Sequence, residues 1–122
     1  MRRSILALPF IALFSMPSNA TLTLESYLKF KASPEPQIKN VLMTYLGGVN
    51  GAMLVMNESF FIRTRIHMYC QPEKLALNAE QLATMIDTYL RDYPQSDKDT
   101  PIEFVALNAL QYTFPCKNTS NN

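Results

Sequence analysis

Apolar residues recur at helical spacing through most of the chain after residue 20. This pattern predicts a short helix over residues 23–32, with Thr23 as its N-cap, and a second helix over about 36–56. Prolines at positions 34 and 36 separate the two helices and suit the first turn of the second. The apolar face expected for the second helix consists of Ile38, Val41, Leu42, Tyr45, Val49, Ala52, Met53 and Met56.

Three glycines, Gly47, Gly48 and Gly51, lie in the middle of this second helix. Each costs up to ~1 kcal/mol of helix stability relative to alanine, so their presence needs a reason. Gly47 and Gly51 are four residues apart and share a face, where another backbone could approach closely. We expect that neighbour to be either the final helix of the same chain or a second copy of the protein. The alternative is a break at 47–48 between two shorter helices, but the apolar rhythm favours one continuous helix.

Residues 57–77 have the least regular pattern. Alternation at 62–66 is strand-like, yet no second strand pattern exists with which it could pair, so a sheet is not expected. We expect the helix to continue to about Arg65 and to be followed by irregular chain through residues 70–72.

A third main helix has a clear start signal. Asn78 is the expected N-cap, and Gln81 three residues later completes a capping box. This helix should end near residues 93–94 and lead into a polar loop over 94–99. Its expected apolar face consists of Leu82, Met85, Ile86, Tyr89 and Leu90.

The last helix is predicted to begin with Thr100 as N-cap, Pro101 in its first turn and Glu103 completing a second capping box. It is apolar nearly all round, which is typical of a buried helix, so we expect it at the centre of the fold. Pro115 should end it. One side carries Ile102, Val105, Ala106, Ala109 and Thr113, and another carries Phe104, Leu107, Leu110 and Phe114.

The N-terminal segment has the pattern of a signal peptide. Arg2 and Arg3 precede an apolar run over 5–14, and 18–20 supply the small residues that signal peptidase favours. The run is too short to span a membrane, which needs roughly 20 residues. We expect cleavage after Ala20, an uncleaved N-terminal anchor being the alternative, and a single helical domain over 21–122.

Charge then narrows the classes of partner. The whole chain has 11 Lys and Arg and 10 Asp and Glu, so removal of Arg2 and Arg3 leaves a net charge of about −1. A nucleic-acid binder would show a basic excess on one face, and an anionic membrane surface would need a polybasic patch. We therefore expect no nucleic-acid partner and, after signal cleavage, no membrane partner.

The chain has two cysteines, Cys70 and Cys116, which enclose the last two predicted helices. In an exported protein of this size they are best interpreted as one disulfide, although two free thiols remain the alternative. Closing this loop should contribute about 4 kcal/mol on the chain-entropy account. The predicted fold class is therefore all-α, a compact bundle of four to five helices with one disulfide.

No catalytic constellation is evident. The single histidine, His67, is more typical of a structural or surface position than of a catalytic one, and both cysteines are used in the expected disulfide. Asp97 and Asp99 could meet a cation, but the glycine and the glutamate of a calcium loop are missing, and a solvated loop is favoured. We expect no enzyme activity, no cofactor and no metal.

Several short stretches, taken in order, nevertheless resemble a known family. They are Tyr-Leu-Gly-Gly-Val-Asn-Gly-Ala at 45–52, Cys-Gln-Pro at 70–72, Gln-Leu at 81–82, Tyr-Leu at 89–90, Tyr-Pro at 93–94, Ala-Leu at 109–110 and Phe-Pro-Cys at 114–116. In this combination the chain resembles the Tai/Rap family of immunity proteins, which protect bacteria against amidase effectors of type VI secretion.

The resemblance implies a periplasmic, all-helical homodimer that binds a papain-like peptidoglycan amidase and blocks its cleft. In the family, a protruding loop and an adjacent helix take part in inhibition. The best candidate loop here consists of Pro94, Gln95, Ser96, Asp97, Lys98 and Asp99. The alternatives are a plain connecting loop and, for function, an acid-stress periplasmic chaperone, an inhibitor of lysozyme or another wall hydrolase, or an accessory subunit of an envelope complex.

Overall fold

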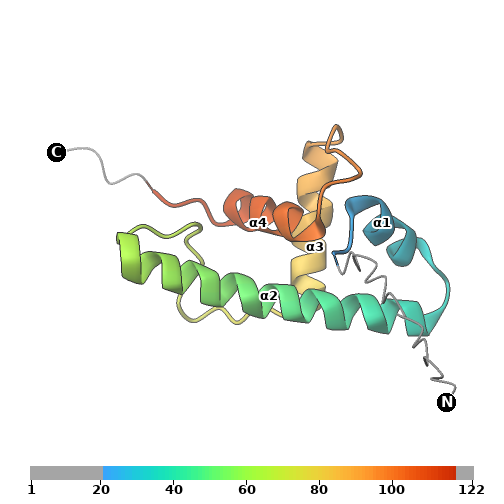
Figure 1. The fold of residues 1–122 in the computed structure, drawn as a ribbon, viewed down its shortest axis with the longest axis horizontal. Helices are drawn as coiled ribbons and strands as arrows, with labels where there is room; N and C mark the ends of the chain where they lie inside the picture. Colours follow the sequence, from blue (N-terminus) through green and yellow to red (C-terminus); the bar gives the residue numbers. More distant parts are fainter. Residues whose placement is uncertain (1–20, 118–122) are drawn as a thin grey trace, which may run out of the picture.

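The computed structural model describes residues 21–117, and the predicted signal peptide at 1–20 lies outside them. The described chain forms four helices, α1 (Leu24–Ala32), α2 (Pro36–Thr64), α3 (Ala79–Asp92) and α4 (Ile102–Thr113). In Figure 1, α2 runs along one side of the molecule, and the other three helices lie together on the opposite side. The predicted all-α class and the Cys70–Cys116 disulfide are both confirmed, and the Cα atoms of the two cysteines are 4.9 Å apart.

Helix α2 is continuous for 29 residues, so a break at 47–48 is wrong. At about 1.5 Å per residue it is roughly 43 Å long. It ends where Arg65 adopts a left-handed conformation, with φ at 62°, close to the predicted position. Its buried residues are Leu42, Leu46, Val49, Met53 and Asn57.

The buried face of α2 is rotated from the predicted one. Val41 was expected inside but is 61% exposed, and Met56 is also exposed, whereas Leu46 is fully buried. Apolar residues surround this helix almost completely, so periodicity alone does not identify the side that meets the core. The consequence is that an apolar strip of α2 faces solvent.

The core forms where α1, α3 and α4 meet the middle of α2. The prediction that α4 is central is confirmed for one side of it, because Ile102, Val105, Ala106, Ala109 and Leu110 are all buried. It is wrong for Phe104, which is 62% exposed. None of the other three described helices covers the Phe104 side of α4. The other buried apolar residues are Leu24, Tyr27, Leu42, Leu46, Val49, Met53, Tyr69, Leu82, Ala83 and Ile86.

The capping box predicted for α4 is wrong. Pro101 occupies the N-cap position, and no side chain caps this helix. The reason is tertiary: Leu24 N donates to Thr100 O at 2.9 Å, and Ile102 N donates to Leu22 O at 2.7 Å. This short bridge holds Pro101 outside the helical conformation, with ψ at 136°, which moves the helix start beyond Thr100.

By contrast, the two other predicted caps are confirmed. The Thr23 side chain accepts a hydrogen bond from Ser26 N, and Asn78 and Gln81 form the reciprocal capping box at the start of α3. Both starts depend on residues three positions apart, and no distant segment competes for their donors.

The irregular segment between α2 and α3 is held by side chains of α2. Asn57 is buried, its Nδ2 donates to Tyr69 O at 2.9 Å, and its Oδ1 accepts from Met68 N at 2.7 Å. Asn50, two turns earlier, donates from Nδ2 to Leu77 O at 2.8 Å. Cys70 N donates to Phe114 O, so the disulfide reinforces a contact that the backbone also makes.

Candidate functional site

The candidate loop at 94–99 connects α3 to α4 at the end of α3 that lies far from α2 (Figure 1). Ser96 is half-buried, and the other five residues are exposed. The loop is ordered by its own hydrogen bonds. Ser96 donates to Tyr93 O from its backbone N and from its hydroxyl, at 3.3 and 2.9 Å, and Asp99 N donates to Asp97 Oδ1 at 3.0 Å.

The loop is also fixed at its far end. Thr100 N donates to Asp97 O at 3.1 Å, and Glu25 N at the start of α1 donates to Lys98 O at 3.0 Å. The first bond closes the loop on itself and the second ties it to α1, so the loop keeps little conformational freedom.

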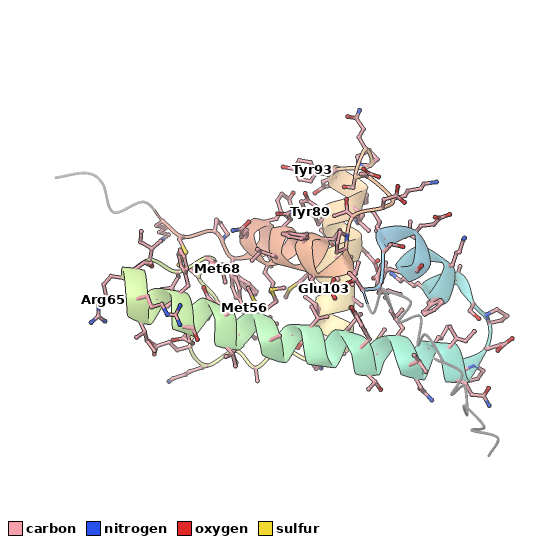
Figure 2. All side chains as sticks on the ribbon, in the orientation of Figure 1. Met56, Arg65, Met68, Tyr89, Tyr93 and Glu103 are labelled. Atoms are coloured by element: carbon pink, nitrogen blue, oxygen red, sulfur yellow. A yellow bond between two sulfur atoms is a disulfide. The ribbon has the colours of Figure 1, made fainter. Side chains whose placement is uncertain are left out.

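Three tyrosines gather beside the loop. Tyr89 and Tyr93 lie one turn apart near the end of α3, with ring centroids 4.8 Å apart (Figure 2). Tyr112 of α4 meets both of them edge-on, at 6.1 and 5.8 Å. Tyr93 is 49% and Tyr112 is 44% exposed, so the group presents aromatic area to solvent. We call these tyrosines, Asp92 and the loop 94–99 the tyrosine surface.

Asp92 links the two helices within this surface. Its Oδ2 accepts a hydrogen bond from the Tyr112 hydroxyl at 2.6 Å. This hydrogen bond, together with the carboxylate charge, raises the pKa of Tyr112 above its usual value. A cavity of about 420 Å³ opens at the same place. Its lining residues are Tyr89, Asp92, Tyr93, Pro94, Gln95 and Ser96.

Sequence reasoning identified the loop but not the tyrosines. It assigned Tyr89 to the apolar face of α3 and used Tyr93 only to mark the helix end. The i, i+4 spacing of these two residues was a usable signal. Tyr112 joins them only because α4 packs on α3, which no local pattern reveals.

The three glycines lie on the exposed part of α2. A Cβ atom placed on Gly47, Gly48 or Gly51 would have no neighbour within 4 Å. The expectation that they allow close packing of the final helix of the same chain is therefore wrong. The other expectation, that a second copy packs there, stays a prediction.

An apolar groove of about 510 Å³ runs between α2 and α4 next to these glycines. Met56 and Glu103 both lie along it (Figure 2). Met56 and Phe104, which both line it, are exposed apolar side chains. We call it the α2–α4 groove, and its lining residues are Thr44, Tyr45, Gly48, Val49, Ala52, Met53, Met56, Glu103, Phe104 and Leu107.

Glu103 is the one charged residue of the groove lining. The Tyr45 hydroxyl donates to one of its carboxylate oxygens, and the other oxygen is buried without a hydrogen-bond partner within residues 21–117. Burial, and then this hydrogen bond, raises the pKa of Tyr45. The pair marks one end of an otherwise apolar surface.

The remaining candidates for chemistry are dispersed. His67 stacks on the Phe61 ring with the centroids 4.0 Å apart and is half-buried, as expected for a structural residue. Asp97 and Asp99 belong to the loop, and within residues 21–117 no three histidine, cysteine or acidic side chains converge on a point that could hold a metal ion. Within the same range no helix has the length and apolarity needed to cross a bilayer.

Comparison of the chain with protein-family models, with curated proteins and with solved structures finds no match. The family resemblance therefore stays a prediction that depends on the short stretches described above.

Proposed function

We propose that the protein is a periplasmic immunity protein that binds a type VI secreted peptidoglycan amidase and occludes its active cleft. The observation that carries the proposal is the ordered loop at 94–99 with exposed tyrosines beside it. A short loop held at both ends can enter a cleft at low entropic cost. Occlusion needs this shape and needs no chemistry from the inhibitor.

The tyrosines supply what a polar loop lacks. Tyrosine is enriched among the few interface residues that carry most of the binding energy. Asp97, Lys98 and Asp99 are exposed at the tip of the loop, where charges mainly affect the association rate. The tyrosines, which would supply binding energy, and the charged residues at 97–99, which would affect the association rate, thus lie at the same end of the molecule.

Export is supported by two independent features. Residues 1–20 have a signal-peptide pattern, and the described chain closes a disulfide, which persists in oxidising compartments such as the periplasm. An amidase that cuts cell-wall peptides would be met in that compartment.

The experiment is co-expression in the periplasm with the amidase-like gene nearest to this one in the genome. We expect rescue from lysis and a complex that co-purifies, and both should be lost when Asp97 and Asp99 are reversed to lysine and Tyr93 is replaced by alanine. If the folded protein is fully expressed but the cells still lyse and no complex forms, this amidase is excluded as the partner. Export itself is checked by the N-terminal residue of the protein recovered from the periplasm, which should be Thr21.

We further propose that a second copy covers the α2–α4 groove. Exposed apolar patches of this kind mark interaction sites, and a two-fold dimer would insert each Phe104 beside the small residues of its partner. Light scattering on the purified protein should give twice the monomer mass, and Phe104→Asp should return the monomer. A monomer at all concentrations up to ~1 mM would rule this dimer out.

The same groove supports a second candidate function, that of an acid-stress chaperone, since such a protein needs apolar surface to hold unfolded clients. In that case acidification to pH 2–3 should expose the groove and sharply raise the fluorescence of a hydrophobic dye. An unchanged dye signal, together with amidase rescue, would leave the immunity function alone.

A further inference from the structure

We infer that the cavity at the end of α3 is a receptor for the guanidinium group of an arginine side chain on the partner protein. The lining brings together two tyrosine rings and one carboxylate, those of Tyr89, Tyr93 and Asp92. The inference names the chemistry of the partner at the proposed amidase-binding surface and depends on that proposal only for the identity of the partner.

The aromatic part of the cavity favours a flat cation. A guanidinium within about 6 Å of a tyrosine ring centroid is attracted by the electrons of the ring face, and its planar shape allows stacking. Tyr89 and Tyr93 have ring centroids 4.8 Å apart and ring planes tilted by 31°, so the two rings stack on each other and leave the outer face of the pair for a guanidinium. Tyr112 packs edge-on against both rings and holds the stack in place.

The carboxylate supplies the matching negative charge. Asp92 is oriented by the Tyr112 hydroxyl, so its position is fixed before any ligand arrives. One such bond leaves most of the acceptor capacity of a carboxylate free. The nearest cation of the described chain, Arg91, has its Nε 3.8 Å from Oδ1, beyond hydrogen-bond distance, and its side chain is mostly exposed. A guanidinium from a partner can therefore displace this weak pair.

The backbone adds to the preference for a cation. The cavity lies at the C-terminal end of α3, where the last carbonyl groups of a helix carry partial negative charge. The loop that follows α3 carries two acidic residues, Asp97 and Asp99, and one basic residue, Lys98, so its net charge is also negative. Arginine is favoured over lysine because its fork can donate two parallel bonds to a carboxylate while it stacks on a ring.

The first test uses the purified protein without any partner. Nα-acetyl-arginine amide is titrated to ~50 mM while the ring proton signals of the tyrosines are followed by NMR. We expect saturable shifts at Tyr89, Tyr93 and Tyr112. The neutral analogue Nα-acetyl-citrulline amide, which has the same shape, should bind at least fivefold more weakly, and Nα-acetyl-lysine amide should fall between the two. Absence of saturable shifts, or equal binding of citrulline and arginine, would overturn the inference.

Variants locate the effect. Asp92→Asn and Tyr93→Ala should each weaken arginine binding at least fivefold, whereas Tyr93→Phe, which keeps the ring face, should retain it. Glu80→Gln removes one exposed carboxylate at the opposite end of the same helix, and Phe60→Ala removes one exposed aromatic ring on α2, so both serve as matched controls. If a control lost as much binding as its cavity variant, the shifts would reflect bulk charge or general stickiness, and the inference would fail.

The two proposals fail separately in this design. If arginine gives saturable shifts that citrulline does not, but the protein does not protect cells from the amidase, the proposed amidase partner is wrong and the arginine site stands. If Asp92→Asn still protects cells from the amidase, and arginine causes no shift in the native protein, the immunity function stands and the arginine site is wrong.

Discussion

The tyrosine surface and the α2–α4 groove are built in opposite ways. The first combines exposed rings with a carboxylate and a loop fixed by hydrogen bonds, whereas the second is an apolar trough with one carboxylate at its end. A surface of the first kind can stay exposed to water without a partner, because its polar groups are hydrated. Surfaces of the second kind gain most from permanent coverage. This difference is the reason why we propose transient recognition at one end of the molecule and stable association along the side of α2.

Both surfaces share α4, and its two ends are held differently. Its start is joined to residues 22–24 by the bridge at Thr23 and Pro101, and the chain just after its end is held by the disulfide. The groove meets the first half of α4, and Tyr112 lies in the second half. The two surfaces can therefore be perturbed independently.

Replacing both Cys70 and Cys116 with serine should lower the free energy of unfolding by about 4 kcal/mol, because the open chain regains the entropy of the closed loop. Urea denaturation measures this loss. Hydrogen exchange should increase more at residues 110–116 than at 102–107, since the disulfide holds only the end of α4. Equal loosening of both halves would contradict the separation of the two surfaces.

Leu110→Ala should cost about 3 kcal/mol, through lost burial and the cavity left in the core. Phe104→Ala, on the exposed side of the same helix, should change the stability of the monomer by less than about 1 kcal/mol. Thermal melts at a concentration below dimer formation measure both. A large loss for Phe104→Ala in the monomer would show that the groove is closed within one chain.

Alkaline pH should act on the core through Tyr27 of α1, whose hydroxyl donates to Ala83 O and Asp87 Oδ1 of α3. Burial raises the pKa of Tyr27 to about 12, from 10.0 in a free side chain. The folded state therefore keeps this proton longer than the unfolded state, so stability is intact below pH 10 and is lost as pH rises from 10 to 12. Two pKa units correspond to about 2–3 kcal/mol. Denaturation at pH 9 and pH 12 should show the loss, and Tyr27→Phe should reduce it.

Gly48→Ala should stabilise the monomer by up to ~1 kcal/mol, because a methyl group there meets no neighbour and helix propensity improves. Gly48→Leu should be tolerated by the monomer and should weaken the proposed dimer at least tenfold, because the larger side chain would occupy the groove. Sedimentation at several concentrations separates the two effects. A dimer unaffected by leucine at position 48 would place the second copy elsewhere.

Charge reversal in the loop should have the smallest effect on folding. Asp97→Lys combined with Asp99→Lys should change stability by less than about 1 kcal/mol, since both side chains are exposed, and should slow association with the amidase about tenfold. Surface plasmon resonance at two salt concentrations measures the rate. Glu73→Lys combined with Glu80→Lys changes the net charge equally away from the loop and should have a much smaller effect on the rate.

Local signals in the sequence were sufficient for most of the fold. Thr23 and Asn78 start their helices as predicted because each cap involves residues only three positions apart. The cysteine pairing followed from there being two cysteines. Sequence reasoning also located the loop at 94–99, since its proline and polar residues interrupt two apolar patterns.

Features that depend on distant neighbours could not be predicted in this way. Thr100 lost its capping role because Leu22 and Leu24 pair with the chain around it. Asn57 is buried because it binds the backbone of Met68 and Tyr69, and an asparagine within a helix gives no sign of this. The tyrosine surface likewise needed the packing of α4 on α3, and the exposure of Phe104 needed the absence of a covering helix in the described chain.

The bridge between Thr23 and Pro101 also has a consequence for the order in which the protein matures. The chain emerges from its N-terminus first, so α1 is the first of the four helices in residues 21–117 to be complete. Its start is fastened by Thr100 and Lys98, which are made much later. The earliest helix therefore has to wait for the last quarter of the chain, and its docking is expected to be a late step that closes the fold.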